Sequence, residues 1–479
     1  MQALLTPRIK REIPSWRTIL QMKNKTEVIV LAAGKGRRMH SDTPKALQKV
    51  GGRPLLQHVL DSVRAIKPVK IHVVYGFGGQ QVREAMSGQE LNWVEQESQL
   101  GTGDAVAKAI PFVDDKSNVL VLYGDVPLIR SETLIRLVEM THSERLALLT
   151  AVATDASGYG RIVRDANGRL ERIVEDLDAS EEEKMIREIN VGLIAAPASL
   201  LESWLGRLDD NSNAQGERYL TDVVEFAAAS SPPAVTCPTT DLDEAAGINS
   251  RTELAKAERI FQRRQAIDLM ANGLTLHDPA RFDLRGTLFV GENSVIDINV
   301  IIEGEVRFGN RVKVGPNCVI RDSIIGDDVI IEANCVIDGA RIEEGCNVGP
   351  FARVRPDTEL APRSKLGNFV EIKKTRLGPG TKVNHLAYLG DTTVGKEVNV
   401  GAGVITCNYD GVNKHRTIIE DGAFIGSDSQ LVAPVTVGKD ATIGAGSTIR
   451  NDAPPGKLTI TRARAKTLQN WRRPKKRST

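Results

Sequence analysis

The sequence feature that limits the possible folds most is a period of six residues in the second half of the chain. Apolar residues recur at this spacing, glycine often follows them, and small residues recur four places after them. Such a repeat is typical of a parallel β-helix, in which six residues form one flat face and three faces complete a coil. The apolar residues are expected to stack inside the coil, while glycine permits the corners. The series runs through Val290, Ile296, Ile302, Phe308, Val314 and Ile320 and, after one-residue slips, through Ile325, Ile331, Ile337, Ile342, Val348, Val354, Leu360, Leu366 and Ile372.

The cysteines follow the same period. Cys318, Cys335 and Cys346 stand at the small-residue position of the repeat, so we expect them to fill the coil interior as small hydrophobic groups. The five cysteines of the chain include no CxxC pair, which argues against a zinc site or a disulfide framework.

One segment interrupts the repeat. Between Val400 and Ile419 the chain reads GAGVITCNYDGVNKHRT, which predicts a loop that leaves the coil. Loops on a rigid scaffold often carry function. A surface insertion without a function is the alternative that the residues leave open.

The first half of the chain alternates short apolar runs with helix-like stretches. This alternation predicts an α/β domain, with a mostly parallel sheet that helices cover and ligand sites beyond the carboxyl ends of the strands. The expected strands are VIVLAAG, KIHVVYG, NVLVLYGD, RLALLTAVAT and AVTCPTT, and the expected helices are 54–65, 103–110 and 131–140.

The changes of pattern divide the chain into segments. We expect an extension at 1–21, the α/β domain at 22–250, a linker helix at 251–272, the β-helix at 273–460 and a basic tail at 461–479. The extension is interpreted as disordered, or as an upstream start that the cell does not use, because Met22 stands just before the first strand.

Composition excludes several functional classes. The net charge of +2 gives no sign of a nucleic-acid or membrane partner. The sequence has no apolar run of the ~18 residues that a spanning helix needs, and its start does not resemble a secretory signal. A cytoplasmic enzyme is therefore expected.

A glycine-rich stretch, LAAGKGRRMHSDTPKAL, follows the first expected strand. Backbone amides at such a turn can bind an anion. Gly34 and Gly36 lack the third glycine of a dinucleotide-binding turn, and no Gly-Lys-Ser/Thr of a Walker loop follows. The residues leave two interpretations open, namely another kind of phosphate-binding loop with Lys45 as a second cation, or a solvated surface turn.

Motifs along the whole chain carry a resemblance to a known family. LAAGKGRRM, PKAL, SQLGTGDA, LYGDVPLI, GYGRIVR, EINVGL, NAQGERYLTD, GPFARVRP, GNFVEIKK, NHLAYLGD, TCNYDG and GSDSQLVAPVTVG occur in this order. The chain resembles the bacterial bifunctional N-acetylglucosamine-1-phosphate uridylyltransferase / glucosamine-1-phosphate N-acetyltransferase family from about residue 27 to WRRPKK.

The resemblance implies a Rossmann-like (GT-A-like) nucleotidyltransferase domain and a left-handed β-helix that assembles as a homotrimer. It also implies acetylation of glucosamine-1-phosphate by acetyl-CoA, followed by uridylyl transfer from UTP to GlcNAc-1-phosphate. The product, UDP-N-acetylglucosamine, is a precursor of peptidoglycan and lipopolysaccharide.

For the first half, the resemblance implies residues that bind the nucleotide, the sugar and one Mg²⁺ ion. Gln96, Gly101 and Thr102 would contact uracil, Arg38 the pyrophosphate, and Asp125 and Asn249 the metal. Asp104 replaces a histidine that is common in the family, with a small expected effect on nucleotide binding. The complete nucleotide and sugar set is Leu31, Ala32, Ala33, Gly34, Arg38, Lys45, Gln96, Gly101, Thr102, Tyr123, Gly124, Asp125, Gly160, Glu175, Asn190 and Asn249.

For the second half, the resemblance implies His385 as the catalytic base and Glu371 as the carboxylate that orients it. Removing a proton from an amine requires a base with a pKa near 7, which suits histidine. A lone histidine in a repeat is otherwise more often a surface residue. The implied sugar-phosphate contacts are Arg355, Lys373, Tyr388 and Asn399, and the implied acetyl-CoA contacts are Ala402, Asn408, Tyr409, Ser427, Ala445 and Arg462.

Two other functions fit these motifs less well. A monofunctional sugar-1-phosphate nucleotidylyltransferase would use its β-helix only for assembly, against which NHLAYLGD and TCNYDG argue. A regulatory or scaffolding paralogue would have lost the phosphate loop or the metal ligands, which are present.

Overall fold

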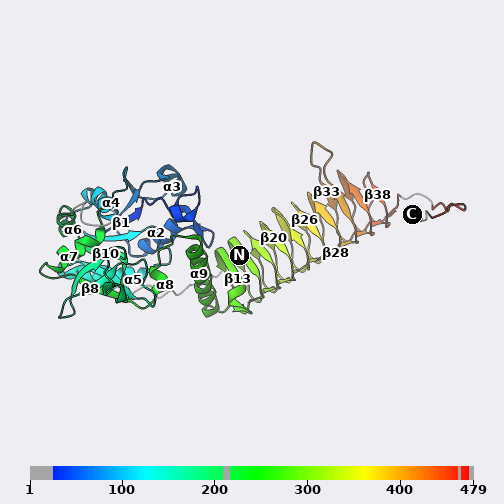
Figure 1. The fold of residues 1–479 in the computed structure, drawn as a ribbon. Helices are drawn as coiled ribbons and strands as arrows, with labels where there is room; N and C mark the ends of the chain where they lie inside the picture. Colours follow the sequence, from blue (N-terminus) through cyan, green and yellow to red (C-terminus); the bar gives the residue numbers. More distant parts are fainter. Residues whose placement is uncertain (1–24, 209–215, 462–464, 474–479) are drawn as a thin grey trace, which may run out of the picture. The chain divides into compact units, whose positions relative to one another are not determined.

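The computed structural model describes residues 25–208, 216–461 and 465–473 (Figure 1). Among them, residues 25–262 form one compact unit and residues 263–473 form another. The expected extension at 1–21 and the implied contact Arg462 lie outside the described residues. In the described part of the chain, no helix is both long and apolar enough to cross a bilayer.

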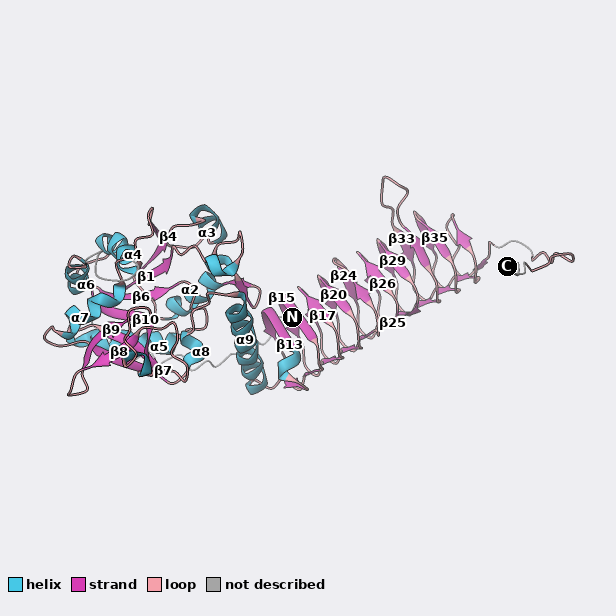
Figure 2. Cartoon of the chain, in the orientation of Figure 1, coloured by secondary structure: helices cyan, strands magenta, loops and turns pink. Residues whose placement is uncertain are grey.

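The first unit is built on a nine-stranded sheet of the order β11-β7-β10-β6-β1-β4-β5, in which β8 pairs with β10 and β9 pairs with β8. Figure 2 shows its central strands β4, β1, β6 and β10. At its centre, β1 (Thr26–Ala32) lies parallel to β4 (Lys70–Tyr75) and β6 (Asn118–Tyr123). Side chains of β1 alternate between two cores, as a buried strand requires. Val28 and Val30 pack with α2 (Leu55–Ala65) and α5 (Ser131–Glu139), and Ile29 and Leu31 pack with α4 (Thr102–Ala109) and α6 (Ala198–Leu205).

Each expected strand and helix of this unit is present, including β7 (Ala147–Val152) and β11 (Val235–Thr239). The sequence did not predict β10 (Glu188–Pro197), which runs antiparallel to β6 and β7. The other elements are η1 (Arg37–Met39), η2 (Lys45–Leu47), β2 (Lys49–Val50), β3 (Arg53–Pro54), α3 (Gly79–Ala85), β5 (Asn92–Glu95), η3 (Ile110–Phe112), η4 (Met140–Ser143), β8 (Arg161–Arg164), β9 (Leu170–Val174), η5 (Glu183–Met185), η6 (Leu220–Asp222), α7 (Val223–Ala228) and α8 (Leu242–Ala245).

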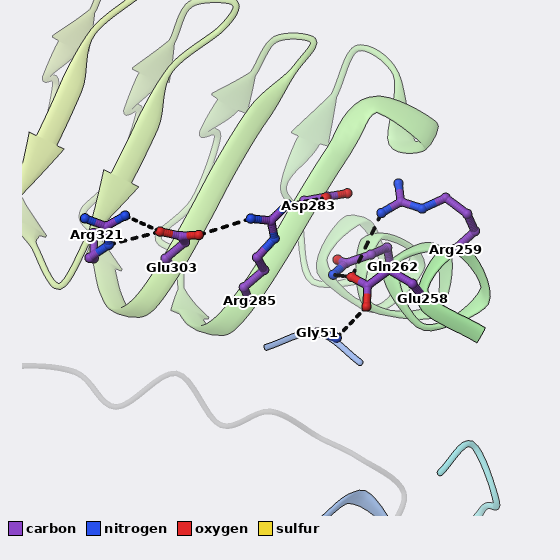
Figure 3. Close-up of polar contacts among 8 residues, drawn as sticks. All are labelled: Gly51, Glu258, Arg259, Gln262, Asp283, Arg285, Glu303 and Arg321. Carbon is purple, nitrogen blue, oxygen red and sulfur yellow. Dashed lines mark hydrogen bonds and ion pairs between the residues drawn. The ribbon is translucent and has the colours of Figure 1, made fainter. Parts of the chain in front are cut away.

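Helix α9 (Arg251–Ala271) contributes to both units, because the boundary between them falls inside it. In the first unit, the Glu258 carboxylate accepts a hydrogen bond of 2.7 Å from the Gly51 backbone N–H (Figure 3), and Phe261 meets the edge of the His58 ring. In the second unit, Ala266 joins the core of the β-helix, and Gln265 donates to a backbone carbonyl of β13. The two halves pack against different cores, which explains the loose apolar face of this helix.

The second unit is a parallel β-helix, visible as a stack of coils in Figure 1. One 11-stranded sheet contains β12, β14, β16, β19, β22, β25, β28, β31, β34, β37 and β39, and a 17-stranded sheet winds around the other two faces. Ile320, Ile337 and Val354 stack directly on successive coils and are fully buried, as the period of six predicts. Cys318, Cys335 and Cys346 are also buried, which confirms that they fill the interior.

Polar side chains inside the coil bond to the backbone of the next coil. The buried hydroxyls of Thr381 and Ser364 donate to the carbonyls of Gly395 and Gly378 at 2.6 and 3.1 Å. These two buried hydroxyls are therefore satisfied without breaking the strand ladders.

The strands of this unit are β12 (Thr275–Leu276), β13 (Phe282–Phe289), β14 (Val295–Ile296), β15 (Val300–Phe308), β16 (Lys313–Val314), β17 (Val319–Arg321), β18 (Ile324–Ile325), β19 (Ile330–Ile331), β20 (Val336–Asp338), β21 (Ala340–Ile342), β22 (Asn347–Val348), β23 (Arg353–Val354), β24 (Thr358–Leu360), β25 (Lys365–Asn368), β26 (Glu371–Lys373), β27 (Arg376–Leu377), β28 (Lys382–His385), β29 (Tyr388–Gly390), β30 (Thr392–Val394), β31 (Asn399–Val400), β32 (Ile405–Cys407), β33 (Thr417–Ile419), β34 (Phe424–Ile425), β35 (Gln430–Val432), β36 (Val435–Val437), β37 (Thr442–Ile443), β38 (Thr448–Ile449) and β39 (Leu458–Thr459), with η7 (Pro279–Arg281) before β13.

A ladder of ion pairs crosses the first coils on the outside. Arg285, Glu303 and Arg321 are directly opposite one another on β13, β15 and β17, and the Glu303 carboxylate accepts from both guanidinium groups (Figure 3). Such partly exposed pairs contribute little stability each, about 0–1 kcal/mol. Their alternating charges instead favour this register of the strands over one that places like charges opposite each other.

Two candidate active sites

The first candidate site lies where β1 and β6 end side by side. Leu31 is paired with Tyr123, and the Gly124 N–H donates to the Leu31 carbonyl at 2.8 Å. The glycine-rich loop begins here, and a Cβ built on Gly34 would meet no atom within 4 Å, so its backbone is open to a ligand. The loops after two neighbouring parallel strands therefore meet at the edge where an α/β sheet binds ligands.

A cluster of three polar residues stands beside this edge. The Lys45 ammonium contacts the Asp125 carboxylate and donates a 2.7 Å hydrogen bond to the Asn249 amide oxygen. The two oxygens come from segments far apart in the sequence and converge on one cation. Carboxylate and amide oxygens are ligands that suit Mg²⁺, which keeps several waters and needs few protein ligands. The described residues contain no group of three or more His, Cys, Asp or Glu side chains that could hold a metal.

Gly160, Glu175 and Asn190, the implied sugar contacts, also come together. The Asn190 backbone N–H donates to the Gly160 carbonyl at 2.8 Å, and a Cβ on Gly160 would lie 3.4 Å from the Glu175 carboxylate. Burial raises the pKa of Glu175, which accepts a hydrogen bond of 2.9 Å from Thr221. Burial and then the Glu175 charge raise the pKa of the adjacent Asp222 to about 6. Sequence reasoning did not assign Thr221 or Asp222, although both stand in the YLTD motif.

The implied uracil contacts form a third group. Gln96 is 3% exposed, and its side-chain amide donates to the Gly101 carbonyl at 3.1 Å and to the Asp104 carboxylate at 2.8 Å. Asp104 is itself only 5% exposed. Thr102 accepts a hydrogen bond from the Leu220 backbone at 3.0 Å. The residue that departs from the family pattern thus contacts Gln96 directly.

The remaining implied nucleotide contacts differ in their exposure. Ala33 is buried, Ala32 is half-buried, and Arg38 is exposed on η1. Burial raises the pKa of Tyr123. Its ring lies so close to Gly192 that a Cβ atom on Gly192 would be 2.2 Å from it. Arg38 is thus exposed, while the Tyr123 ring packs against Gly192.

The second candidate site follows one corner of the β-helix. His385 ends β28, and its Nδ1 lies 2.6 Å from the Oδ1 atom of Asn368 on the preceding coil. The carbonyls of His385, Ala402 and Ser427 each accept an N–H from the next coil, so these residues occupy the same corner on successive coils. Ala445 occupies the same corner on the coil after Ser427. The Gly446 N–H donates to the Ser427 carbonyl, just as the Asp428 N–H donates to the Ala402 carbonyl one coil earlier. The candidate base and three implied acetyl-CoA contacts are therefore aligned.

Charged residues lie on the adjoining face. Glu371 stands directly opposite Tyr388, and its carboxylate accepts a 2.9 Å hydrogen bond from Arg355. Its expected role in orienting His385 stays a prediction, since the hydrogen bonds found are Glu371 to Arg355 and His385 to Asn368. Lys414, from the inserted loop, lowers the pKa of Lys373 most, with a further contribution from Arg355. Sequence reasoning missed Lys414, although it is a cation within the interrupting loop.

The inserted loop is braced from within. The Asp410 carboxylate accepts from the backbone of Val412 and Asn413 and pairs with the His415 ring at 2.6 Å. Asn408 donates to Asp391 at 2.6 Å, which ties the base of the loop to the coil. On the coil itself, Asn399 stands opposite Lys382, beside the column of His385. The loop is therefore an ordered part of this site, with Tyr409 exposed on it.

Comparisons with known proteins identify related domains in both units of the chain. A family model described as MobA-like NTP transferase domain matches residues 28–218, and one described as bacterial transferase hexapeptide (six repeats) matches residues 416–451. "Bifunctional protein GlmU" of Azoarcus sp. (strain BH72) is 51% identical over 450 residues, covering 94% of this chain and 99% of the relative. The proteins of that name from Alkalilimnicola ehrlichii and Legionella pneumophila (strain Lens) are each 52% identical, covering 95% and 94% of this chain and 97% and 99% of the relatives. The chain belongs to the GlmU family.

This membership confirms the resemblance found in the motifs, the fold class and the bifunctional activity. As a GlmU protein, the chain synthesises UDP-N-acetylglucosamine, with uridylyl transfer in the NTP transferase domain and acetyl transfer in the hexapeptide domain. The monofunctional and non-enzymatic alternatives are thereby set aside.

Proposed function

We propose that uridylyl transfer occurs at the cluster of Lys45, Asp125 and Asn249 and depends on one Mg²⁺ ion. The observation that carries this proposal is that the Asp125 carboxylate oxygen and the Asn249 amide oxygen converge on one cation, the Lys45 ammonium. When bound, Mg²⁺ would neutralise charge on the phosphates of UTP. The phosphate of GlcNAc-1-phosphate is already an anion, so the chain needs no general base here. Its own residues align the two substrates, with the open backbone at Gly34 and the Lys45 ammonium for the phosphates and Glu175 and Asn190 for the sugar.

Gln96 is the residue that we assign to uracil, together with Gly101 and Thr102. Its amide nitrogen is engaged by Asp104 and Gly101, so its oxygen is the atom left to accept a hydrogen bond from a base. The N3–H of uracil is such a donor, whereas the corresponding nitrogen of cytosine is an acceptor. Asp104 and the Gly101 carbonyl therefore together determine which end of the Gln96 amide faces the nucleotide.

Replacing Asp104 by asparagine is expected to weaken UTP binding. The side-chain amide of an asparagine can donate as well as accept. It would therefore also allow the Gln96 amide to flip, so that its oxygen no longer faces the base and a buried hydrogen bond is misplaced. The KM for UTP should rise by roughly 5- to 100-fold, with a smaller change in kcat. Steady-state kinetics of uridylyl transfer measure this effect, with exposed Glu97→Gln as the matched control. An unchanged KM in folded Asp104→Asn would show that Asp104 does not orient Gln96.

Acetyl transfer is assigned to the corner of His385. The free amine of glucosamine-1-phosphate attacks the thioester carbon of acetyl-CoA, its proton passes to His385, and the C–S bond breaks to release CoA. Three cations gather on the adjoining face: Arg355, Lys373 and Lys414. Their mutual repulsion lowers the pKa of Lys373, and a bound sugar phosphate would relieve it.

Tyr388 and Asn399 flank the corner on its two faces. Acetyl-CoA would extend along Ala402, Ser427 and Ala445, with Asn408 and Tyr409 of the loop beside it.

We propose that the chain assembles as a homotrimer through this same corner. Phe351, Phe369 and Leu386 form an apolar column there, and their side chains are 48%, 54% and 62% exposed. The two phenylalanine rings stack at 5.0 Å, and all three residues have positive φ angles, which bulky residues rarely adopt. Burying such a column against a second copy would stabilise both. Light scattering should give the mass of a trimer, and a stable monomer with acetyl transfer intact would contradict the assignment.

A single incubation tests the whole proposal. The enzyme, with glucosamine-1-phosphate, acetyl-CoA, UTP and Mg²⁺, should produce UDP-N-acetylglucosamine, CoA and pyrophosphate. Omitting Mg²⁺ should leave CoA release intact and stop pyrophosphate release. These substrates are cytoplasmic metabolites, so we assign the enzyme to the cytoplasm, with no nucleic-acid or membrane partner.

A further inference from the structure

The side chain that contacts the His385 ring is Asn368. The Nδ1 atom of His385 lies 2.6 Å from the Oδ1 atom of Asn368. An amide oxygen can only accept a hydrogen bond, so the proton of a neutral ring must sit on Nδ1. The Nε2 atom then carries the lone pair, which is the form that a general base requires.

The β-helix brings these two residues together through its backbone. Asn368 on β25 stands directly opposite His385 on β28, and the Leu386 N–H donates to the Asn368 carbonyl at 3.0 Å. The neighbouring position, Gly367, has no room for a side chain, because a Cβ there would lie 1.8 Å from the Asn384 carbonyl oxygen. The coils approach closely at Gly367, and the next residue, Asn368, is the one whose side chain can reach the His385 ring.

The charged residues nearby do not replace Asn368 as this partner. Lys365 and Lys382 are opposite each other on β25 and β28. On the adjoining face, Glu371 is paired with Arg355 at 2.9 Å. The hydrogen-bond acceptor found at His385 Nδ1 is thus a neutral amide rather than a carboxylate.

We propose that Asn368 is a positioning residue for acetyl transfer, which holds His385 in the Nδ1–H tautomer and leaves Nε2 to take the proton of the attacking amine. The inference rests on the proposed function of His385 as the base. It adds a residue that does not touch the substrates and acts only through the ring.

Two substitutions at Asn368 separate this role from a structural one. Asn368→Ala removes the acceptor, so the ring can rotate and change tautomer, and the kcat of acetyl transfer should fall by roughly 10- to 100-fold, as for other residues that orient a histidine. KM values should change by less than a few-fold. Asn368→Asp keeps the acceptor and should restore most of kcat at high pH. Its added negative charge favours the imidazolium, so the acidic limb of the pH–rate profile should move to higher pH.

The controls use the other activity and another asparagine. Uridylyl transfer from GlcNAc-1-phosphate should be unchanged in both variants, which reports that the chain is folded. Asn347→Ala alters an asparagine on β22 of the same sheet and should leave both activities unchanged. Nitrogen-15 NMR of the histidine rings should show the Nδ1–H form of His385 in the wild type and a mixture of tautomers in Asn368→Ala.

Each contrary result has a distinct meaning. If His385→Ala is inactive in acetyl transfer but Asn368→Ala retains kcat within two-fold, the positioning role is wrong and the base assignment stands. If Asn368→Asp loses kcat like alanine, or its acidic limb does not move, the hydrogen bond does not act through the ring. If His385→Ala itself retains acetyl transfer, the proposed function of the corner fails first.

Discussion

Replacing His385 by alanine should lower the kcat of acetyl transfer by roughly 10² to 10⁴, the usual contribution of a positioned general base. The loss follows because His385 is the side chain that we propose takes the proton of the amine. Acetyl-CoA binding should change little, since its proposed contacts are at Ala402, Ser427 and Ala445 on later coils. Release of CoA from acetyl-CoA and glucosamine-1-phosphate measures the rate.

The matched control for His385 is His277→Ala. His277 belongs to the first coil of the same domain, and its exposed ring lies with Nδ1 3.2 Å from the Asp297 carboxylate. This variant should keep the wild-type rate of acetyl transfer. Uridylyl transfer should be unchanged in both variants. A kcat of His385→Ala within a few-fold of wild type would mean that His385 is not the base.

Replacing Asp125 by alanine should have an equally large effect on the other reaction. It removes the only charged member of the oxygen pair that would bind Mg²⁺, so uridylyl transfer should fall by at least about 10²-fold, as when a group that stabilises transition-state charge is removed. The remaining activity should need more Mg²⁺ for saturation. Pyrophosphate release over a range of Mg²⁺ concentrations measures both changes.

Asp115→Ala is the control for this substitution, because Asp115 is exposed in the same unit and away from the cluster. Acetyl transfer should remain at the wild-type rate in both Asp125→Ala and Asp115→Ala. The two units have separate cores, so a change at Asp125 should not reach the β-helix. An equal loss of both activities in folded Asp125→Ala would contradict two independent sites.

The β-helix could be predicted almost entirely from the sequence, because each interior residue is specified by local spacing. Ile320, Ile337 and Val354 are stacked as the period requires. The first unit could be predicted only in part. Its strands and helices follow from local patterns, but the antiparallel path of β10 depends on pairing with β6 and β7, which no local pattern encodes.

The candidate sites likewise contain contacts that local spacing predicts and contacts that it does not. Lys45 and Asn249 are 204 residues apart, so only the resemblance connected them before the structure showed their contact. Asn368, by contrast, could have been found from the repeat, since it precedes His385 by 17 residues, the length of one coil here. The family motif predicts Glu371 in this role instead, but the register places Glu371 opposite Tyr388. Asp104 could not be interpreted from its position alone, because its importance lies in the contact with Gln96.

The central claim is that one chain carries two complete and independent active sites. Mixing purified His385→Ala with Asp125→Ala tests it most directly, with glucosamine-1-phosphate, acetyl-CoA, UTP and Mg²⁺ supplied together. Each variant alone should form little UDP-N-acetylglucosamine, and the mixture should form it readily, because GlcNAc-1-phosphate made by Asp125→Ala diffuses to the intact uridylyl site of His385→Ala. The double variant, added in the same total amount, should stay inactive. A mixture no more active than the single variants would contradict the account.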